Sequence, residues 1–186
     1  MDDLRQRLRA LPSFPDDLPV LDPSSVPDDP AELFAAWLDD AIASGARQPH
    51  AMDLVTLRPD GSPDARVLIL KDVDERGYHF SSHRTSTKGV ELAGDARAAL
   101  VFFWRESGRS VRIDGIASPL DEATSQADWR ARPSFDGRPN TDWQVWALAP
   151  HAFEFLQARH DRRHTRLGYT RSDEGWRHAP VTTPAG

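Results

Sequence analysis

The chain has 186 residues and a net charge of −6 at pH 7, which fits one domain of ordinary size with a substantial core. An acidic chain is a poor general binder of nucleic acid. The sequence contains no cysteine, which excludes disulfides, thiolate catalysis and cysteine-ligated metal centres. Its apolar runs are far shorter than the roughly 20 residues of a membrane span. Its acidic start carries no signal-peptide pattern, so we expect a cytoplasmic protein without membrane contact.

The first elements are an arm and a helix. Residues 11–30 are rich in Pro, Asp and Ser, so residues 1–28 are predicted to form a flexible arm that could lie on a partner subunit. Residues 29–186 then form the folded domain. Asp29 as N-cap, Pro30 at the first position and Gly45 past the end define a helix. Its predicted buried face comprises Leu33, Phe34, Trp37, Leu38 and Ile42.

The remainder of the chain has the pattern of short strands separated by turn residues. Predicted strands cover residues 52–57, 65–71, 78–82, 98–104, 110–115, 152–157 and 166–170. Two further helices are predicted, one from about Ser86 to Gly94 and one capped by Asp121 that ends near Ala131. Five or more short antiparallel strands with peripheral helices indicate a mainly β fold, most simply a small β-barrel.

Basic side chains gather in three places before the tail: Arg66 with Lys71, Arg84 with Lys88, and Arg109 with Arg130 and Arg132. The second group lies in a hydroxyl-rich loop that leads into a helix. A helix N-terminus with free N–H groups suits a phosphate. Each group alone is as well explained by solvated charge. Several of them in an acidic protein favour a phosphorylated ligand.

The tail carries the motif Arg162-x-His164-x-Arg166. On an extended segment these three side chains would share one face and converge on an anion, with His164 positioned to transfer a proton. A solvated basic strand edge is the alternative. The chain has no Gly-x-Gly-x-x-Gly loop, P-loop or Gly-x-Ser-x-Gly elbow. His160 and His164 lie four apart in a segment predicted to be extended, which does not favour a metal site, so we expect none.

From about Asp29 to Pro180 the chain resembles the pyridoxamine 5′-phosphate oxidase family, FMN enzymes with a split-barrel fold that act as homodimers. The resemblance rests on segments that follow one another in the family's order: Asp29-Pro30 to Trp37-Leu38, Arg66 to Lys71, Phe80-Ser81-Ser82, Ser86-Thr87-Lys88, Arg109-Ser110-Val111, Arg132-Pro133 and the tail motif. It implies an FMN-binding split β-barrel with peripheral helices, and FMN at the interface of a homodimer.

The resemblance also implies a role for each matching residue. Those implied to bind FMN are Arg66, Val67, Leu68, Ile69, Leu70, Lys71, Ser81, Ser82, Thr87, Lys88, Ser110 and Arg166. Lys71 and Arg132 would hold the substrate phosphate, and Arg162 and His164 would lie over the substrate as catalytic residues. The implied reaction converts pyridoxamine or pyridoxine 5′-phosphate to pyridoxal 5′-phosphate, with O2 as the acceptor.

Several positions depart from the family pattern: Thr87, Ser110, Asp128 and Leu156. Asp128 stands where a Tyr contacts the substrate phosphate, and its charge would repel that group at close range. The segment between Arg132 and Trp143 is short and lacks a Gln-Ser pair that contacts FMN from the second subunit. These departures leave open an FMN-dependent oxidase of another aromatic metabolite, as in the phenazine pathway. A non-catalytic flavin-binding module and a deazaflavin-dependent reductase are further alternatives.

Overall fold

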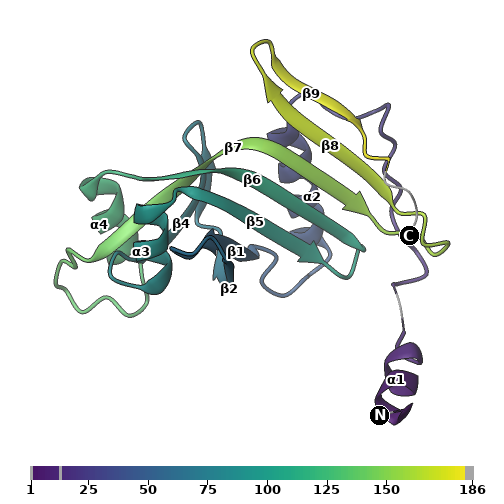
Figure 1. Cartoon of the computed structure of the whole chain (residues 1–186), viewed down its shortest axis with the longest axis horizontal. Coiled ribbons are helices and arrows are strands. Elements are labelled where there is room, and N and C mark those ends of the chain that lie inside the picture. The colour runs from purple at the N-terminus through teal and green to yellow at the C-terminus, as the bar shows by residue number, and fades with distance from the viewer. Residues whose placement is uncertain (1, 13, 183–186) are drawn as a thin grey trace.

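The computed structural model describes residues 2–12 and 14–182, and within them the chain forms four helices and nine strands (Figure 1). The helices are α1 (Asp2–Arg9), α2 (Pro30–Ala43), α3 (Thr87–Gly94) and α4 (Glu122–Arg130). The strands are β1 (Ala51–Leu57), β2 (Pro63–Ile69), β3 (Asp72–Asp74), β4 (Gly77–His83), β5 (Arg97–Trp104), β6 (Arg109–Pro119), β7 (Trp143–Gln157), β8 (Thr165–Ser172) and β9 (Gly175–Pro180). None of the helices in these ranges is long and apolar enough to span a membrane.

The three helices of the folded domain begin where the sequence predicted. Asp29, Ser86 and Asp121 are the N-caps of α2, α3 and α4, and each side chain accepts a hydrogen bond from a backbone N–H of the first turn. These bonds satisfy donors that the helix itself leaves unpaired. The cap at Ser86 fixes the position of the α3 N-terminus, which becomes part of the site described below.

All strands pair antiparallel in one sheet of order β2-β1-β5-β6-β7-β4-β3, with the β8–β9 hairpin also joined to β7. Strand β7 organises this sheet. Its first half pairs with β4, its second half pairs with β8, and β6 takes its other edge. The strands beside β7 therefore separate into two groups, which splits the barrel along one long strand (Figure 1). The predicted mainly β architecture with peripheral helices is confirmed.

The bend in the long strands depends on one glycine. The register between β6 and β7 shifts between Asp114 and Gly115. A Cβ atom at Gly115 would lie only 2.4 Å from the carbonyl oxygen of Ala149, so a larger residue cannot fit this close approach. Such a bulge bends and twists a strand pair, which allows β6 and β7 to serve both halves of the sheet.

Helix α2 closes the barrel with an apolar face that includes Leu33, Phe34, Trp37 and Ala41. The ring of Phe34 packs edge-on against the rings of Tyr78 and Phe102, with centroid separations of 5.0 Å to each. The prediction that Ile42 belongs to this face was wrong, because Ile42 is 56% exposed. The buried stripe advances by four residues per turn from Leu33, which selects Ala41 instead.

Two described stretches of the predicted arm differ in how they pack. Helix α1, which the sequence did not predict, stands away from the sheet (Figure 1). Further along, Leu21 is buried and the carbonyl of Pro27 accepts a hydrogen bond from the Tyr169 hydroxyl at 2.8 Å. This second part therefore packs on its own chain. A flexible arm of residues 1–28 that reaches a partner stays a prediction.

Candidate functional site

A cavity of about 350 Å³ opens between β2, the end of β4 and the loop after α4. Predicted site residues that line it are Val67, Leu68, Ile69, Lys71, Ser81, Ser82, Lys88 and Arg132. The fold thus brings together one residue from each of the three basic groups that the sequence singled out, Lys71, Lys88 and Arg132. Arg109 lies elsewhere and pairs with Asp40. Lining residues that the sequence did not assign to the site are Gln48, Ala51, His83 and Trp143. Trp143 is buried on the cavity wall.

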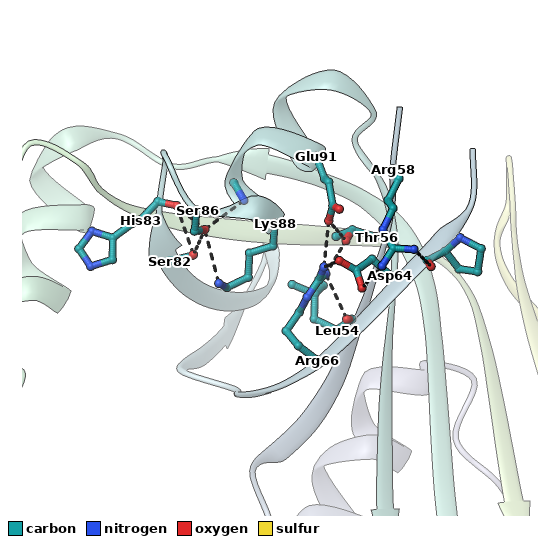
Figure 2. A network of polar contacts seen from close by, with 12 residues as sticks. Leu54, Thr56, Arg58, Asp64, Arg66, Ser82, His83, Ser86, Lys88 and Glu91 are labelled. Carbon is teal, nitrogen blue, oxygen red and sulfur yellow. Dashed lines mark hydrogen bonds and ion pairs between the residues drawn. The ribbon is translucent and has the colours of Figure 1, made fainter. Parts of the chain in front are cut away.

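Hydroxyl groups and one ammonium group meet at the N-terminus of α3 (Figure 2). The Ser82 and Ser86 hydroxyl oxygens lie 2.8 Å apart, and the Lys88 ammonium donates to Ser86 Oγ at 3.4 Å. The first N–H groups of α3 add further donors and the positive end of the helix dipole. Together these groups form a subsite for an anion such as a phosphate.

The charge of Lys88 is not compensated by a carboxylate. Within the described residues, no Asp or Glu lies at ion-pair distance from its ammonium group. Burial lowers the pKa of Lys88, the neighbouring Arg66 lowers it further, and Glu91 opposes this. An anion bound beside Lys88 would relieve both effects, so the local electrostatics favour such a ligand.

The contacts of Arg66 indicate a different role from the phosphate contact that the family resemblance implied. Its guanidinium group lies 2.9 Å from Glu91 and 2.8 Å from Asp64, and it also donates to the hydroxyl of Thr56 (Figure 2). The Glu91 side chain is only 4% exposed. Arg66 is therefore the counter-ion of a buried carboxylate, and it is absent from the residues that line the cavity.

On α4, Asp128 lies between two residues of the cavity wall, Lys71 and Trp143. Its carboxylate is 3.3 Å from the Lys71 ammonium and accepts a hydrogen bond from the Trp143 indole at 2.8 Å. The guanidinium of Arg132 stacks over the Trp143 ring at 4.3 Å, and its Nε is buried with no partner in the described part of the chain. The two residues implied to hold the substrate phosphate thus share one cavity, but Lys71 already has an anionic partner.

Ser110, Leu156 and Arg166 form a separate group in the sheet. They are directly opposite one another across β6, β7 and β8, so their side chains share one face. Arg166 donates to Glu154 at 2.6 Å. Of the other residues implied to bind FMN, Thr87 is exposed at the start of α3 and Leu70 is buried in the core, and neither lines the cavity.

Arg162 and His164 lie in the turn between β7 and β8. Arg162 has a φ of +60°, and the Asp161 carboxylate accepts from the Arg163 N–H at 3.0 Å. The expectation that Arg162, His164 and Arg166 share an extended face was therefore wrong, since only Arg166 belongs to a strand. His164 accepts the Arg159 N–H at Nδ1, at 3.0 Å. Arg162 and His164 line a second cavity of about 300 Å³.

The two groups of residues are far apart in one chain. The first cavity includes Trp143 at the start of β7, whereas Arg162 and His164 follow its end at Gln157. A strand of this length extends about 45 Å. Figure 1 likewise places α3 and α4 at one end of the long strands and the turn after β7 at the other. One chain alone cannot bring both groups to one ligand.

A split antiparallel barrel with a hydroxyl-rich cationic cavity at a sheet edge defines the class of flavin-binding split-barrel proteins. Residues 38–157 match the family described as pyridoxamine 5′-phosphate oxidase, and residues 143–180 match the family described as the pyridoxine 5′-phosphate oxidase C-terminal dimerisation region. The chain belongs to the pyridoxamine 5′-phosphate oxidase family, and it is an FMN-dependent oxidoreductase. The fold and cofactor that the resemblance implied are confirmed.

Curated relatives named pyridoxine/pyridoxamine 5′-phosphate oxidase include one from Rubrobacter xylanophilus, 33% identical over 183 residues that cover 80% of this chain and 84% of the relative. Another, from Gluconobacter oxydans, is 34% identical over 194 residues, with 86% and 96% covered. Among solved structures, PhzG from Burkholderia lata 383 in complex with tetrahydrophenazine-1-carboxylic acid has a TM-score of 0.83 and 28% identity, covering 89% of this chain and 99% of that one. An FMN-binding protein from Nostoc punctiforme, with a TM-score of 0.69 and 16% identity, covers 87% and 100% and shares the fold.

The residues of the first cavity fit FMN. The flavin phosphate requires cationic and hydrogen-bonding partners, which Lys88, Ser82 and Ser86 supply without a competing carboxylate in the described residues. The ring requires an apolar surface, and Val67 and Ile69 present side chains that are 68% and 38% exposed on the edge strand β2. Both side chains line the cavity, and apolar lining is the usual surface of a site for a planar ligand.

Proposed function

We propose that this enzyme oxidises pyridoxamine or pyridoxine 5′-phosphate to pyridoxal 5′-phosphate, with O2 as the electron acceptor. The observation that carries the proposal is one cavity lined by three cationic side chains, Lys88 at α3 and Lys71 with Arg132 beside α4. FMN and a phosphorylated substrate each bring a phosphate, so the pair requires two cationic subsites. The relatives at 33% and 34% identity carry the name of this activity.

In this proposal Lys88, Ser82 and Ser86 hold the FMN phosphate, and the Val67 to Ile69 segment lies along the ring. When bound, FMN takes two electrons from the substrate as a hydride and passes them to O2, which yields hydrogen peroxide. The alcohol substrate also releases one proton. The amine substrate consumes one water molecule and releases ammonia. The protein holds the reacting carbon of the substrate at the flavin ring and transfers these protons.

His164 is the proposed proton-handling residue. Its Nδ1 accepts the backbone N–H of Arg159, so in the neutral ring Nε2 carries the proton and is the atom free to exchange it. Arg162 supplies a positive charge in the same turn. Their distance from the first cavity in one chain requires that a second copy bring them to the substrate. We therefore propose a homodimer with FMN at the interface, which the match to a dimerisation region supports.

A second candidate is an FMN-dependent oxidase of another aromatic metabolite. It is favoured by the contact between Asp128 and Lys71, because this contact reduces the positive charge available to a substrate phosphate. The similarity to PhzG, whose solved complex contains a tricyclic carboxylic acid, supports it further. Both candidates share the cofactor and the hydride chemistry, and differ in the charged group of the substrate.

The test is an absorbance spectrum of the purified protein, followed by oxygen consumption with B6 vitamers and aromatic metabolites. Flavin absorbance and peroxide formation with either phosphorylated vitamer are expected. FMN-loaded protein that turns over neither vitamer would sink the leading proposal, and equal rates with and without a phosphate would favour the second candidate. FMN binding without any turnover would indicate a non-catalytic binding module. Displacement of FMN by a deazaflavin would indicate a deazaflavin-dependent reductase. Cell fractionation tests the cytoplasmic location that we propose with it.

A further inference from the structure

The contact of Asp128 with Lys71 is built into the wall of the cavity. The Asp128 side chain is 17% exposed and that of Lys71 is 27% exposed. The Trp143 indole donates to the second carboxylate oxygen at 2.8 Å, so both oxygens of Asp128 have partners. Because Trp143 is itself 4% exposed, the carboxylate is held in place by a side chain that has little freedom to move.

The charges around Asp128 in the cavity wall sum to a small positive value. Lys71 and Arg132 contribute one positive charge each, and Asp128 contributes one negative charge. Lys88 also lines the cavity, but it contacts Ser86 at the start of α3, where the FMN phosphate is proposed to bind. The single surplus charge is centred on Arg132, whose Nε has no partner in the described residues although it is buried. A doubly charged phosphate in this place would meet two cations and one anion at close range.

The wall around Arg132 is aromatic. The Trp143 ring lies 5.0 Å from the His83 ring and 5.3 Å from the Trp129 ring, and the Arg132 guanidinium stacks on Trp143 at 4.3 Å. The His83 ring is nearly perpendicular to the Trp143 ring and the Trp129 ring is tilted against it, so this wall offers ring edges and the guanidinium plane to a planar ligand. The anionic group of that ligand would then meet the edge of the guanidinium.

We propose that Asp128 is a specificity-determining residue that selects a planar aromatic substrate whose peripheral oxyanion carries a single negative charge. A carboxylate and a singly protonated phosphate ester both meet this condition. The inference rests on the proposed oxidase function and concerns the substrate end of that same site. Asp128 thereby acts against the doubly charged phosphate that a Lys71 and Arg132 pair alone would bind most tightly.

The test compares the FMN-loaded wild type with Asp128→Asn, whose amide oxygen can still accept from the Trp143 indole. The matched control is Asp136→Asn, which removes one charge from an exposed side chain of the neighbouring loop. Three ligands that cannot be oxidised are titrated at pH 8 by tryptophan fluorescence. They are 4-deoxypyridoxine 5′-phosphate, 4-deoxypyridoxine and phenazine-1-carboxylate. At this pH the phosphate is doubly charged, because its second pKa is about 6.

Coulomb energy scales with ligand charge, so Asp128→Asn is expected to lower the Kd of the phosphate by about tenfold and that of the carboxylate by about threefold. The uncharged ligand and the Asp136→Asn control should stay at their wild-type Kd. Asp128→Tyr, which also removes the charge, should tighten the phosphate in the same way if the Asn variant does not fold. In the wild type at pH 8, tighter binding of the carboxylate than of the phosphate assigns a carboxylate substrate. A phosphate Kd that falls when the pH is lowered below about 6, where the ester carries a single charge, assigns a singly protonated phosphate.

Unchanged phosphate affinity in both Asp128 variants would overturn the inference. This result is separable from failure of the proposed function, which is measured by turnover. A wild type that oxidises none of the candidate substrates loses the proposed function, while the binding titrations still score the charge effect of Asp128. If the wild type is active and the Asp128 variants bind the phosphate with unaltered Kd values, only the inference about Asp128 is wrong and the proposed function stands.

Discussion

The carboxylate of Glu91 lies 2.9 Å from the guanidinium of Arg66, although the Glu91 side chain is only 4% exposed. Burial of a carboxylate without a cation costs folding free energy, so Arg66 stabilises Glu91. The same ion pair holds the Arg66 side chain in place. The hydroxyl of Thr56 completes the contact by donating to Glu91 at 2.6 Å. The pair joins α3 to β2, which are the two elements that flank the phosphate subsite.

Replacement of Arg66 by Met is therefore expected to act first on stability. Loss of the cation leaves Glu91 buried and unpaired, which should lower the free energy of unfolding by about 3 kcal/mol. Urea denaturation measures this change. Arg58→Met is the control, because Arg58 forms its ion pair with the shared Asp64 and its side chain is 48% exposed. That exposed pair should contribute less than about 1 kcal/mol. Wild-type stability in the Arg66 variant, with loss of FMN binding alone, would contradict the structural role.

Lys88 is expected to set the affinity for FMN and its dependence on pH. Lys88→Met removes a charge-assisted contact and should weaken FMN binding by about 10-fold to 100-fold, measured by flavin fluorescence. Burial and Arg66 lower the pKa of Lys88 from its ordinary 10.5. Affinity is thus complete below the lowered pKa and falls as pH rises through it. A fall only above 10.5 would contradict this, and Lys88→Arg should keep its affinity to higher pH.

Without FMN the linkage of Lys88 to folding has the opposite sign. The folded pKa lies below the unfolded value, so between the two pKa values the unfolded chain binds more protons. The lowered pKa therefore costs stability at neutral pH, and this cost disappears as pH rises through the folded and then the unfolded pKa. Lys88→Met should accordingly raise the stability of the FMN-free protein at pH 7, while it weakens FMN binding. Thermal unfolding with and without FMN measures both effects.

The local signals of the sequence predicted most elements, because caps and turns are determined by neighbouring residues. The caps at Asp29 and Asp121 are examples. The sequence placed the start of β7 at residue 152 instead of Trp143. The first six residues of β7 are all buried, so they lack the alternation that marks a half-exposed strand. Strands β3 and β9 were missed because β3 is very short and β9 is largely exposed and polar.

For the site, the sequence identified which residue types line the cavity but not which ion pairs they form. It predicted Lys71, Lys88 and Arg132, which share one cavity. It did not predict that Arg66 would pair with Glu91, since the two are 25 positions apart and meet only through the packing of α3 on the barrel. The repulsion expected between Asp128 and a phosphate follows from charge alone. The contact of Asp128 with Lys71 depends on how α4 packs beside the end of β2, which no local sequence pattern determines.

A site built from two chains predicts complementation between two inactive variants. Lys88→Met damages the first cavity, and His164→Ala damages the turn after β7, so each homodimer should lose most of its activity. A mixed dimer has one site with both parts intact. Random mixing by co-expression should therefore restore about a quarter of the wild-type rate of peroxide formation. Activity no higher than the mean of the two parents would contradict a shared site, and a mixture of Lys88→Met with Lys88→Arg serves as the control.

Two glycines of α3 give a matched pair that tests how closely this helix must approach the loop before it. A Cβ atom at Gly89 would lie 2.5 Å from the backbone oxygens of His83 and Arg84, whereas one at Gly94 has no atom within 4 Å. Gly89→Ala should therefore push the α3 N-terminus and Lys88 away from Ser82, with a loss of roughly 2 kcal/mol of stability. FMN affinity should fall although no charge changes.

Gly94→Ala should leave FMN binding intact and raise stability by up to about 1 kcal/mol, because alanine has less freedom in the unfolded chain. Calorimetry and FMN titration separate these effects, and equal FMN affinity in the two variants would show that cofactor binding does not depend on this close approach.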